Sequence, residues 1–153
     1  RLAAKLKARI DAVAERSSAR PRRPRLYFEE WGEPMMSCSG WVSELIAVAG
    51  GVDVFADRAR NKAAKDRMVT PEEVAAAQPD IIVGSWCGQR FDPAHVTARA
   101  GFSRIPAVRA GFLREIDSTV ILQPGPAALT DGLDALTAVI SEFGGGISQS
   151  ASS

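Results

Sequence analysis

The sequence is poor in the residues from which metal centres and catalytic triads are built. Its 153 residues include two cysteines, Cys38 and Cys87, and one histidine, His95. A zinc site uses three or four nitrogen, sulfur or carboxylate ligands at defined spacing, and neither a Cys-x-x-Cys pair nor a pair of histidines is present. A Ser-His-Asp or Cys-His unit would have to use His95, which follows the helix-starting pair Asp92-Pro93 and is interpreted as a surface residue. The sequence thus predicts no catalytic residues and no metal site.

The chain also lacks long apolar runs and phosphate-binding loops. No run approaches the roughly 18 apolar residues of a membrane span, and the chain opens on a charged helix-forming segment rather than a secretory leader. Neither G-x-G-x-x-G nor G-x-x-x-x-G-K-S/T occurs, so a nucleotide-phosphate cradle has no support. A length of 153 residues predicts one domain with its own core.

The net charge of +1 conceals a strongly basic start. Residues 1–25 hold nine Lys/Arg and two acidic residues, whereas the remainder holds ten and sixteen. Such an arm binds nucleic acid or anionic lipid in some proteins, and in others it is a solvated helix face followed by a basic linker. Because no aromatic residues are interleaved for stacking on bases, we favour the solvated face and expect no nucleic-acid partner.

The first expected element is an amphipathic helix over residues 1–20. Its apolar stripe is Leu2, Leu6, Ile10 and Val13. Pro21 and Pro24 end the helix and lie in a short basic linker. The helix begins at the first residue without a cap, which suggests that an upstream sequence has been cut away.

Residues 25–51 predict a strand, a loop and a helix. Leu26 to Phe28 are apolar and favour a buried strand, and a loop follows in which Gly32 and Pro34 stop any regular element. Ser37 or Ser39 is expected to cap a helix whose apolar face is Trp41, Leu45, Val48 and Ala49, so Trp41 is assigned to the core. Gly50-Gly51 ends that helix.

The remaining elements alternate between helices and strands. Thr70-Pro71-Glu72-Glu73 is a capping box that starts a helix, and Ile81 to Gly84 fit a strand buried on both faces. We expect a surface loop over 52–65, a helix from Asp92 to about Arg99, strands at 107–108 and 112–116, a loop over 117–123, a helix from about Pro126 to Phe143, and a disordered Gly/Ser tail over 144–153. This alternation predicts an α/β fold with a mainly parallel sheet.

In such a sheet, ligands bind at the loops that follow the carboxyl ends of the strands. The loop after the first strand carries Glu29, Glu30, Trp31, Glu33, Met35 and Met36. The loop after the strand 81–84 carries Trp86, Cys87, Gln89 and Arg90. These two loops are the first places to look for a ligand site.

Several short motifs, taken in order, resemble a known family. They are Tyr27-Phe-Glu-Glu-Trp31, Gly40-Trp-Val-Ser-Glu-Leu-Ile46 with Ala49-Gly-Gly51, Val69-Thr-Pro-Glu-Glu-Val74, Pro79-Asp-Ile-Ile82, Cys87-Gly88, Ile105-Pro-Ala-Val108, and Pro124-Gly-Pro126 with Asp131-Gly-Leu133. Their order and spacing resemble the C-terminal lobe of class III periplasmic binding proteins, the substrate-binding components of ABC importers for cobalamin, ferric siderophores and haem. The cobalamin-binding branch is the most similar.

The resemblance implies a single lobe of a bilobal binding protein. The lobe is expected to be a three-layer αβα sandwich over residues 25–143, preceded by the end of a long interlobe helix over residues 1–24, with the N-terminal lobe missing. It implies a non-catalytic protein at the periplasmic or extracellular face of a membrane, with an importer permease as its partner. The family often has a basic residue after the Gly-Pro pair and an acid before it, whereas this chain has Ala127 and Val120-Ile-Leu-Gln123. Glu29, Glu30 and Glu33 are therefore the candidate docking acids.

The ligand implied by the resemblance is a corrinoid, with haem or a ferric siderophore as the alternative. Trp31 and Trp86 would supply flat apolar surface, and Gln89 and Arg90 would meet amides or anionic oxygens. Glu30, Met35 and Cys87 complete the expected ligand site. Two other classes remain open, an α/β enzyme and a free-standing interaction domain that uses the basic arm.

The two cysteines leave a further alternative. Cys38 and Cys87 both follow predicted strands at the same end of the sheet, so a disulfide is possible if those strands are neighbours, and an oxidising compartment would favour it. Otherwise Cys87 is a small buried residue that lets its loop turn.

Overall fold

The computed structural model describes residues 2–123, 125–126 and 128–152 of the chain. The strands are β1 (Arg25–Gly32), β2 (Met35–Ser37), β3 (Val52–Asp53), β4 (Ile81–Gly84) and β5 (Leu113–Glu115). The helices are α1 (Leu2–Ser18), α2 (Gly40–Ala49), α3 (Ala56–Ala59), α4 (Pro71–Ala77), α5 (Pro93–Thr97), α6 (Pro106–Arg109), α7 (Ser118–Ile121) and α8 (Leu133–Ser152), with 3₁₀ turns η1 (Ala64–Arg67) and η2 (Phe102–Arg104) and a π-helical turn η3 (Ala128–Gly132). Helices and strands alternate as the sequence predicts.

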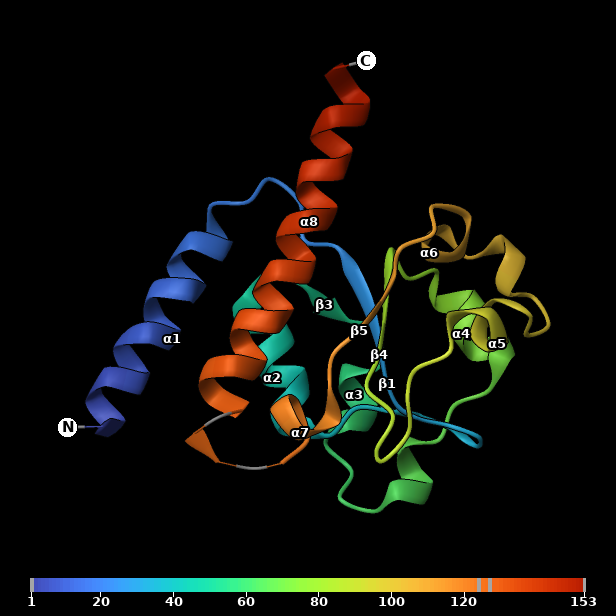
Figure 1. Ribbon diagram of the computed structural model, residues 1–153, viewed down its shortest axis with the longest axis horizontal. Coiled ribbons are helices and arrows are strands. Elements are labelled where there is room, and N and C mark those ends of the chain that lie inside the picture. Colours follow the sequence, from blue (N-terminus) through green and yellow to red (C-terminus); the bar gives the residue numbers. More distant parts are fainter. Residues whose placement is uncertain (1, 124, 127, 153) are drawn as a thin grey trace.

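The sheet is mainly parallel and brings three strand ends to one edge. Its order is β2-β1-β4-β5, and β3 pairs with the start of β1. β1 is parallel to β4, and β4 is parallel to β5, whereas β2 runs back antiparallel to β1. The carboxyl ends of β1, β4 and β5 therefore share the lower edge in Figure 1, here called the carboxyl edge.

Helices cover both faces of the sheet, so the three-layer αβα architecture is confirmed. On one face, Leu26 and Phe28 of β1 pack with α1, α2 and α8. On the other, Tyr27 of β1 and Ile82 of β4 pack with α4, α5 and α6. All residues of β4 are buried, as expected of a strand covered on both sides. Figure 1 shows the two helical layers on either side of the strands.

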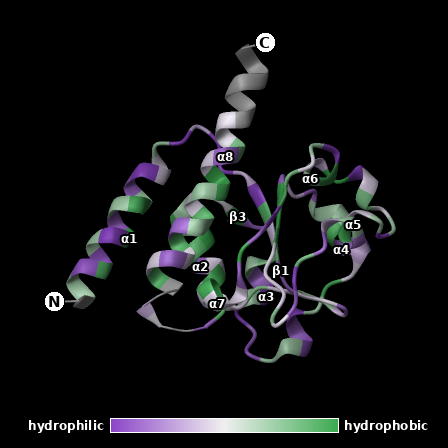
Figure 2. Cartoon of the chain, viewed as in Figure 1, coloured by the Kyte–Doolittle hydropathy of each residue, from purple (hydrophilic) through white to green (hydrophobic). Residues whose placement is uncertain are grey.

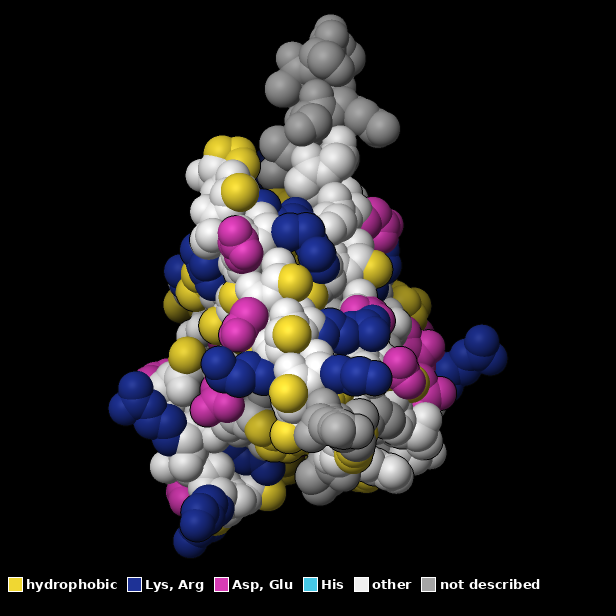
Figure 3. All heavy atoms as spheres, turned by 90° about the vertical axis from the view of Figure 1, so that its left-hand side faces the viewer, with side chains coloured by type: hydrophobic (Ala, Val, Ile, Leu, Met, Phe, Trp, Pro, Cys, Tyr) yellow, Lys and Arg dark blue, Asp and Glu magenta, His cyan; other side chains and the backbone are white. Residues whose placement is uncertain are grey.

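The first helix is amphipathic and carries mixed charge. Hydrophobic and hydrophilic residues alternate along α1 (Figure 2), and Val13 reaches the core. Basic and acidic side chains are interspersed over this side of the molecule (Figure 3). Arg9 pairs with Asp134 of α8. This mixture favours the solvated-face interpretation of the basic arm over a binding surface of one sign.

The predicted caps of two helices are confirmed. Gly50 ends α2 with a φ of 103°, which only glycine adopts without strain. Thr70 starts α4 with the full capping box, because its side chain accepts the Glu73 N–H while the Glu73 carboxylate accepts the Thr70 N–H. Ser39 precedes α2 but its hydroxyl makes no capping bond.

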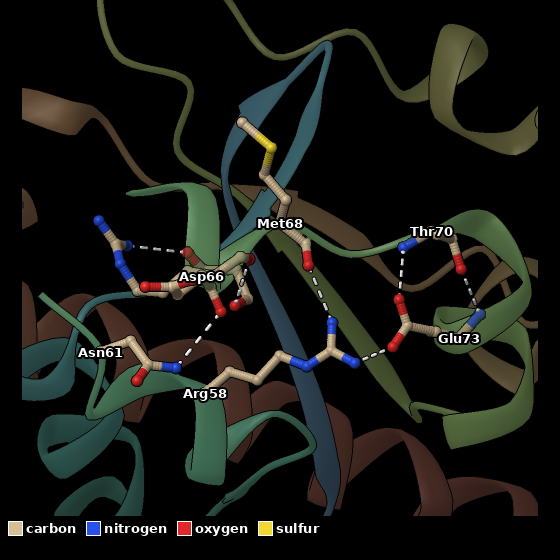
Figure 4. A network of polar contacts seen from close by, with 8 residues as sticks. Arg58, Asn61, Asp66, Met68, Thr70 and Glu73 are labelled. Atoms are coloured by element: carbon tan, nitrogen blue, oxygen red, sulfur yellow. Dashed lines mark hydrogen bonds and ion pairs between the residues drawn. The ribbon is translucent and has the colours of Figure 1, made fainter. Parts of the chain in front are cut away.

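The segment expected as a surface loop over 52–65 is instead organised. It contains β3, α3 and the start of η1. Arg58 of α3 donates to the Met68 carbonyl oxygen and pairs with the Glu73 carboxylate, so the capping box of α4 also anchors this segment (Figure 4). Asn61 donates to the Asp66 carbonyl oxygen in the same network. These elements are only two to four residues long and contain few apolar residues, so they give no periodic pattern in the sequence.

Three further expectations differ from the structure. The segment Ala107-Val108, predicted as a strand, belongs to the helical turn α6. Pro106 occupies the first position of this turn, which proline favours, and the apolar character of Ala107 reflects its burial in the core. The predicted loop 117–123 contains α7, which Asp117 caps. Residues 144–152 continue α8, where the sequence predicts a disordered tail. Pro124, expected just before the last helix, and Ala127, expected near its start, lie outside the described residues, as does Ser153.

Candidate functional site

The predicted loop after the first strand is a β-hairpin. β1 continues to Gly32, and β2 returns along it from Met35. The pairing slips by one residue between Glu29 and Trp31, which is a β-bulge at the carboxyl edge. The sequence predicted that the strand stops at Phe28, because the two acidic residues that follow are not typical of a buried strand.

Glu29 of β1 is the centre of a buried polar cluster. Its carboxylate is 0% exposed and accepts hydrogen bonds from the Tyr27 hydroxyl (2.6 Å) and the Trp86 indole N–H (2.9 Å). Arg99, just after α5, donates both guanidinium nitrogens to it at 2.8 and 3.0 Å. These donors replace the hydrogen bonds to water that the carboxylate loses on burial. Glu29 is therefore a structural group, and its predicted role as a surface docking acid is wrong.

The cluster fixes the Trp86 side chain at the carboxyl edge. Trp86 is 7% exposed, and its ring contacts Phe91 edge-on at 5.2 Å between centroids. A Cβ built on Gly32 would lie 2.8 Å from the Trp86 ring, so the hairpin needs glycine at this point. Arg99 also donates to the Gly32 carbonyl oxygen at 3.0 Å. The hairpin and the loop after β4 are thereby joined, and Trp31 and Trp86 lie at the same edge.

Glu30 points to the opposite face of the sheet from Glu29 and anchors the start of α2. Its carboxylate accepts the Ser39 N–H at 2.6 Å and the Arg67 guanidinium at 3.3 Å. Arg67 also donates to the Ser37 carbonyl oxygen. The alternation expected of a strand is confirmed, and the carboxylate of Glu30 is already occupied within the lobe.

Two adjoining hollows form the concave part of the carboxyl edge. The first, of about 640 Å³, lies between the loops after β4 and β5 and is here called the strand-end hollow. It is lined by Trp86, Gly88, Gln89, Arg90, Glu115, Ile116, Asp117, Ser118 and Thr119. The second, of about 340 Å³, lies beside the hairpin and is called the hairpin hollow. It is lined by Gly32, Glu33, Trp86, Gln89, Arg90, Asp92 and His95.

The structure brings together three of the predicted ligand residues and separates the others. Trp86, Gln89 and Arg90 line both hollows. Trp31 is half-buried, and its indole N–H donates to the Glu33 carbonyl oxygen at 2.8 Å. Met35 is buried and lines a third hollow of about 430 Å³, which shares Gly32, Glu33 and His95 with the hairpin hollow.

Sequence reasoning missed the residues that the third strand end contributes. Asp117 and Thr119 line the strand-end hollow because they follow β5, the third strand of the parallel set. Hydrogen bonds from the Thr119 hydroxyl and N–H hold the pKa of Asp117 below its ordinary value. His95 is exposed, as predicted, but it also lines the hairpin hollow beside the Trp86 ring. The predicted strand over 112–116 was the signal that could have identified Asp117 and Thr119, because the loop after a third parallel strand lies at the same edge of the sheet.

The two cysteines are free, so neither sequence alternative holds. Cys38 is buried, and its thiol contacts the Asp53 carboxylate at 3.3 Å. Burial, reinforced by Asp53, raises the pKa of the Cys38 thiol well above its ordinary value. Cys87 is exposed on the loop after β4, so it is not the small buried residue, and its thiol is not paired with Cys38 in this structure.

The groups that line the two hollows are mainly aromatic, polar and charged. Among the residues that the structure describes, no group of three or more His, Cys, Asp or Glu side chains is placed to hold a metal ion. Within the same residues, no helix combines the length and hydropathy of a membrane span. The edge offers one aromatic ring, amide and hydroxyl groups, and charges of both signs, which suits the orientation of a polar-rimmed molecule.

In open α/β sheets, hollows at the carboxyl ends of the parallel strands are the usual place for a ligand. Comparison with known families makes the assignment specific. Residues 1–120 match the family described as periplasmic binding protein, and the chain belongs to that family. No curated protein sequence matches it.

Solved structures share the fold at low sequence identity. A possible iron-binding periplasmic solute-binding protein of Staphylococcus epidermidis is similar with a TM-score of 0.75 and 19% identity over 91% of this chain. The periplasmic haem-binding protein of Roseiflexus sp. is similar with a TM-score of 0.68 and 24% identity over 91% of this chain. The periplasmic vitamin B12 binding protein of Vibrio cholerae is similar with a TM-score of 0.66 and 19% identity over 90% of this chain. The chain spans 53%, 55% and 51% of those three structures, about half of each.

Proposed function

We propose that this chain is one lobe of a two-lobed substrate-binding protein that captures a metal-chelate macrocycle, with a corrinoid such as cobalamin as the favoured ligand. The observation that carries this proposal is the pair of adjoining hollows at the carboxyl edge, which share Trp86, Gln89 and Arg90. They lie in a chain of the periplasmic binding protein family that spans about half of similar structures.

The chemistry of the shared residues suits a large amphipathic ligand rimmed by amides. Trp86 presents an aromatic edge that is fixed by its bond to Glu29. Gln89 and Arg90 are exposed and supply an amide and a guanidinium, which bond to carbonyl oxygens of a ligand rim. An open edge of this kind holds one side of a ligand, and a second lobe would enclose the other.

The proposed partner is the membrane permease of an ABC importer, on the periplasmic or extracellular side of the membrane. Glu33 is exposed at the tip of the hairpin, so it remains the candidate docking acid. Glu29 is excluded by its burial, and Glu30 is held by Ser39 and Arg67. The role is non-catalytic, because capture and release need only non-covalent contacts.

Haem or a ferric siderophore is the second candidate. It is favoured by the names of the similar structures, which include a haem-binding protein and a possible iron-binding protein. Arg90 suits the anionic oxygens of such ligands as well as it suits amides.

Binding of cyanocobalamin, haemin and ferrichrome to the two-lobed protein that contains this chain tests the proposal by calorimetry. We expect cyanocobalamin to bind most tightly, and this lobe alone to bind each ligand weakly because half of the contacts are absent. Gln89→Ala with Arg90→Ala should weaken binding at least several-fold. Lys62→Ala, an exposed change in a separate hollow beside α2, is the control and should leave affinity unchanged.

Absence of binding to all three ligands would contradict the proposal. Tight corrinoid binding by residues 1–153 alone would contradict the half-site. A preference for haemin would select the second candidate.

A further inference from the structure

The charges around the two hollows are strongly unequal. The strand-end and hairpin hollows together are lined by four carboxylates, Glu33, Asp92, Glu115 and Asp117, all of them exposed. Arg90 is the one Lys or Arg side chain among the residues that line these two hollows. With His95 counted as neutral, the lining of this part of the edge carries an excess of three negative charges.

Three of these carboxylates are held in place by the backbone. Asp92 caps α5 by accepting the Ala94 and His95 N–H groups, and Asp117 caps α7 by accepting the Thr119 N–H at 2.8 Å. Glu115, at the end of β5, accepts the Phe91 N–H at 2.9 Å. Local bonds thus keep these negative charges at the rim, where a ligand must approach them.

Three other basic residues line a hollow separate from the strand-end and hairpin hollows. Arg60, Lys62 and Arg67 line a separate concavity of about 610 Å³ beside the start of α2. Arg67 is paired there with Glu30. The rim of the strand-end and hairpin hollows is therefore not neutralised by these cations, and its negative excess acts on any ligand that Trp86 contacts.

We infer that these carboxylates select by charge, so that the chelate held at this edge is uncharged or cationic and macrocycles with peripheral carboxylates are bound more weakly. This inference rests on the proposed function, since it assigns the charge class of the ligand at the same site. It separates a corrinoid from haem, because an amide-rimmed corrinoid avoids the repulsion that the propionates of haem meet.

The expected size of the effect follows from Coulomb's law. One added ligand carboxylate at about 10 Å from three excess negative charges in water is disfavoured about tenfold at low ionic strength. Screening reduces this to about twofold at physiological ionic strength. The ratio of two dissociation constants, measured at both ionic strengths, therefore reports the field of the rim.

The test compares cyanocobalamin with a monocarboxylic acid derivative in which one of its side-chain amides is hydrolysed. The two ligands share the macrocycle and differ by one negative charge. Binding of both is measured by calorimetry on the two-lobed protein that contains this chain. We expect the derivative to bind about tenfold more weakly at low salt and about twofold more weakly at physiological salt.

Asp92→Asn with Asp117→Asn isolates the contribution of this lobe. Asparagine caps helices as well as aspartate does, so α5 and α7 are retained while two charges are removed. The tenfold ratio should fall to about twofold at low salt. Asp11→Asn with Glu15→Gln on α1 is the matched control, because it removes two exposed charges away from the edge and should leave the ratio unchanged.

The outcomes separate the inference from the proposed function. If neither corrinoid binds, the corrinoid form of the proposed function fails, and tight binding of haemin in its place overturns the charge selection as well. If both bind with equal affinity, or if the acid binds more tightly, the proposed function stands and the charge selection is overturned. A ratio that persists unchanged in the Asp92/Asp117 variant also overturns the inference, because the selection then arises outside this rim.

Discussion

Replacing Glu29 with glutamine should destabilise the lobe severely. The carboxylate is 0% exposed, and the Arg99 side chain that it pairs with is 9% exposed. Glutamine keeps one acceptor oxygen but turns an amide NH₂ toward groups that are themselves donors, so it leaves the Arg99 guanidinium buried without a counter-charge. Breaking one partner of a buried ion pair costs about 3–5 kcal/mol, against a total of about 5–15 kcal/mol for a typical domain.

Urea denaturation followed by tryptophan fluorescence measures this loss. Glu33→Gln is the matched control at the exposed hairpin tip, and it should lie within about 0.5 kcal/mol of the parent. In Glu29→Gln combined with Arg99→Met no unpaired charge remains, so the double variant should be more stable than the sum of the single changes by about 2 kcal/mol. A Glu29→Gln protein within about 1 kcal/mol of the parent, or strict additivity, would refute the buried-pair reasoning.

Three further predictions concern the core and the cysteines. Burial, and then the Glu29 charge, raise the pKa of Tyr27, so the stability from this group is complete below about pH 10 and is lost as pH rises through that value toward the folded pKa. Because Tyr27 is the one tyrosine of the chain, absorbance at 295 nm should show no tyrosinate until the protein unfolds, and a normal titration in the folded state would contradict its burial. Gly84→Ala should destabilise by about 1–3 kcal/mol in urea denaturation, because its Cβ would lie 1.9 Å from Phe91, and a neutral effect would show that the ring moves freely. Maleimide labelling with mass spectrometry should modify Cys87 rapidly in the folded protein and Cys38 only in denaturant, so equal rates would contradict the assigned exposures.

Much of the fold was predictable because local signals agreed with its packing. The capping box at Thr70 depends on residues only three apart. The end of α2 requires a left-handed backbone conformation at residue 50, which glycine adopts and few other residues do. The four consecutive apolar residues of β4 report burial on both faces. Alternation of such elements was enough to predict the parallel sheet and the edge at which its loops meet.

The candidate site was less predictable because its contacts join residues far apart in sequence. Trp86 and Arg99 converge on Glu29 across 57 and 70 residues. The sequence placed Trp86 in the ligand site, where it does line both hollows, but not its bond to a buried acid. Asp117 gave a capping signal that was overlooked, because α7 is only four residues long.

The opposite directions of Glu29 and Glu30 in β1 have a consequence for how the chain tolerates length changes. Two neighbouring acids leave one strand in opposite directions, Glu29 toward Arg99 and Glu30 toward the start of α2. Because side chains alternate, deleting or inserting a single residue before them would exchange the two environments and place each acid among the other's partners. Homologous sequences should therefore vary freely in loop length after this strand, yet keep the spacing between its apolar start and its paired acids constant.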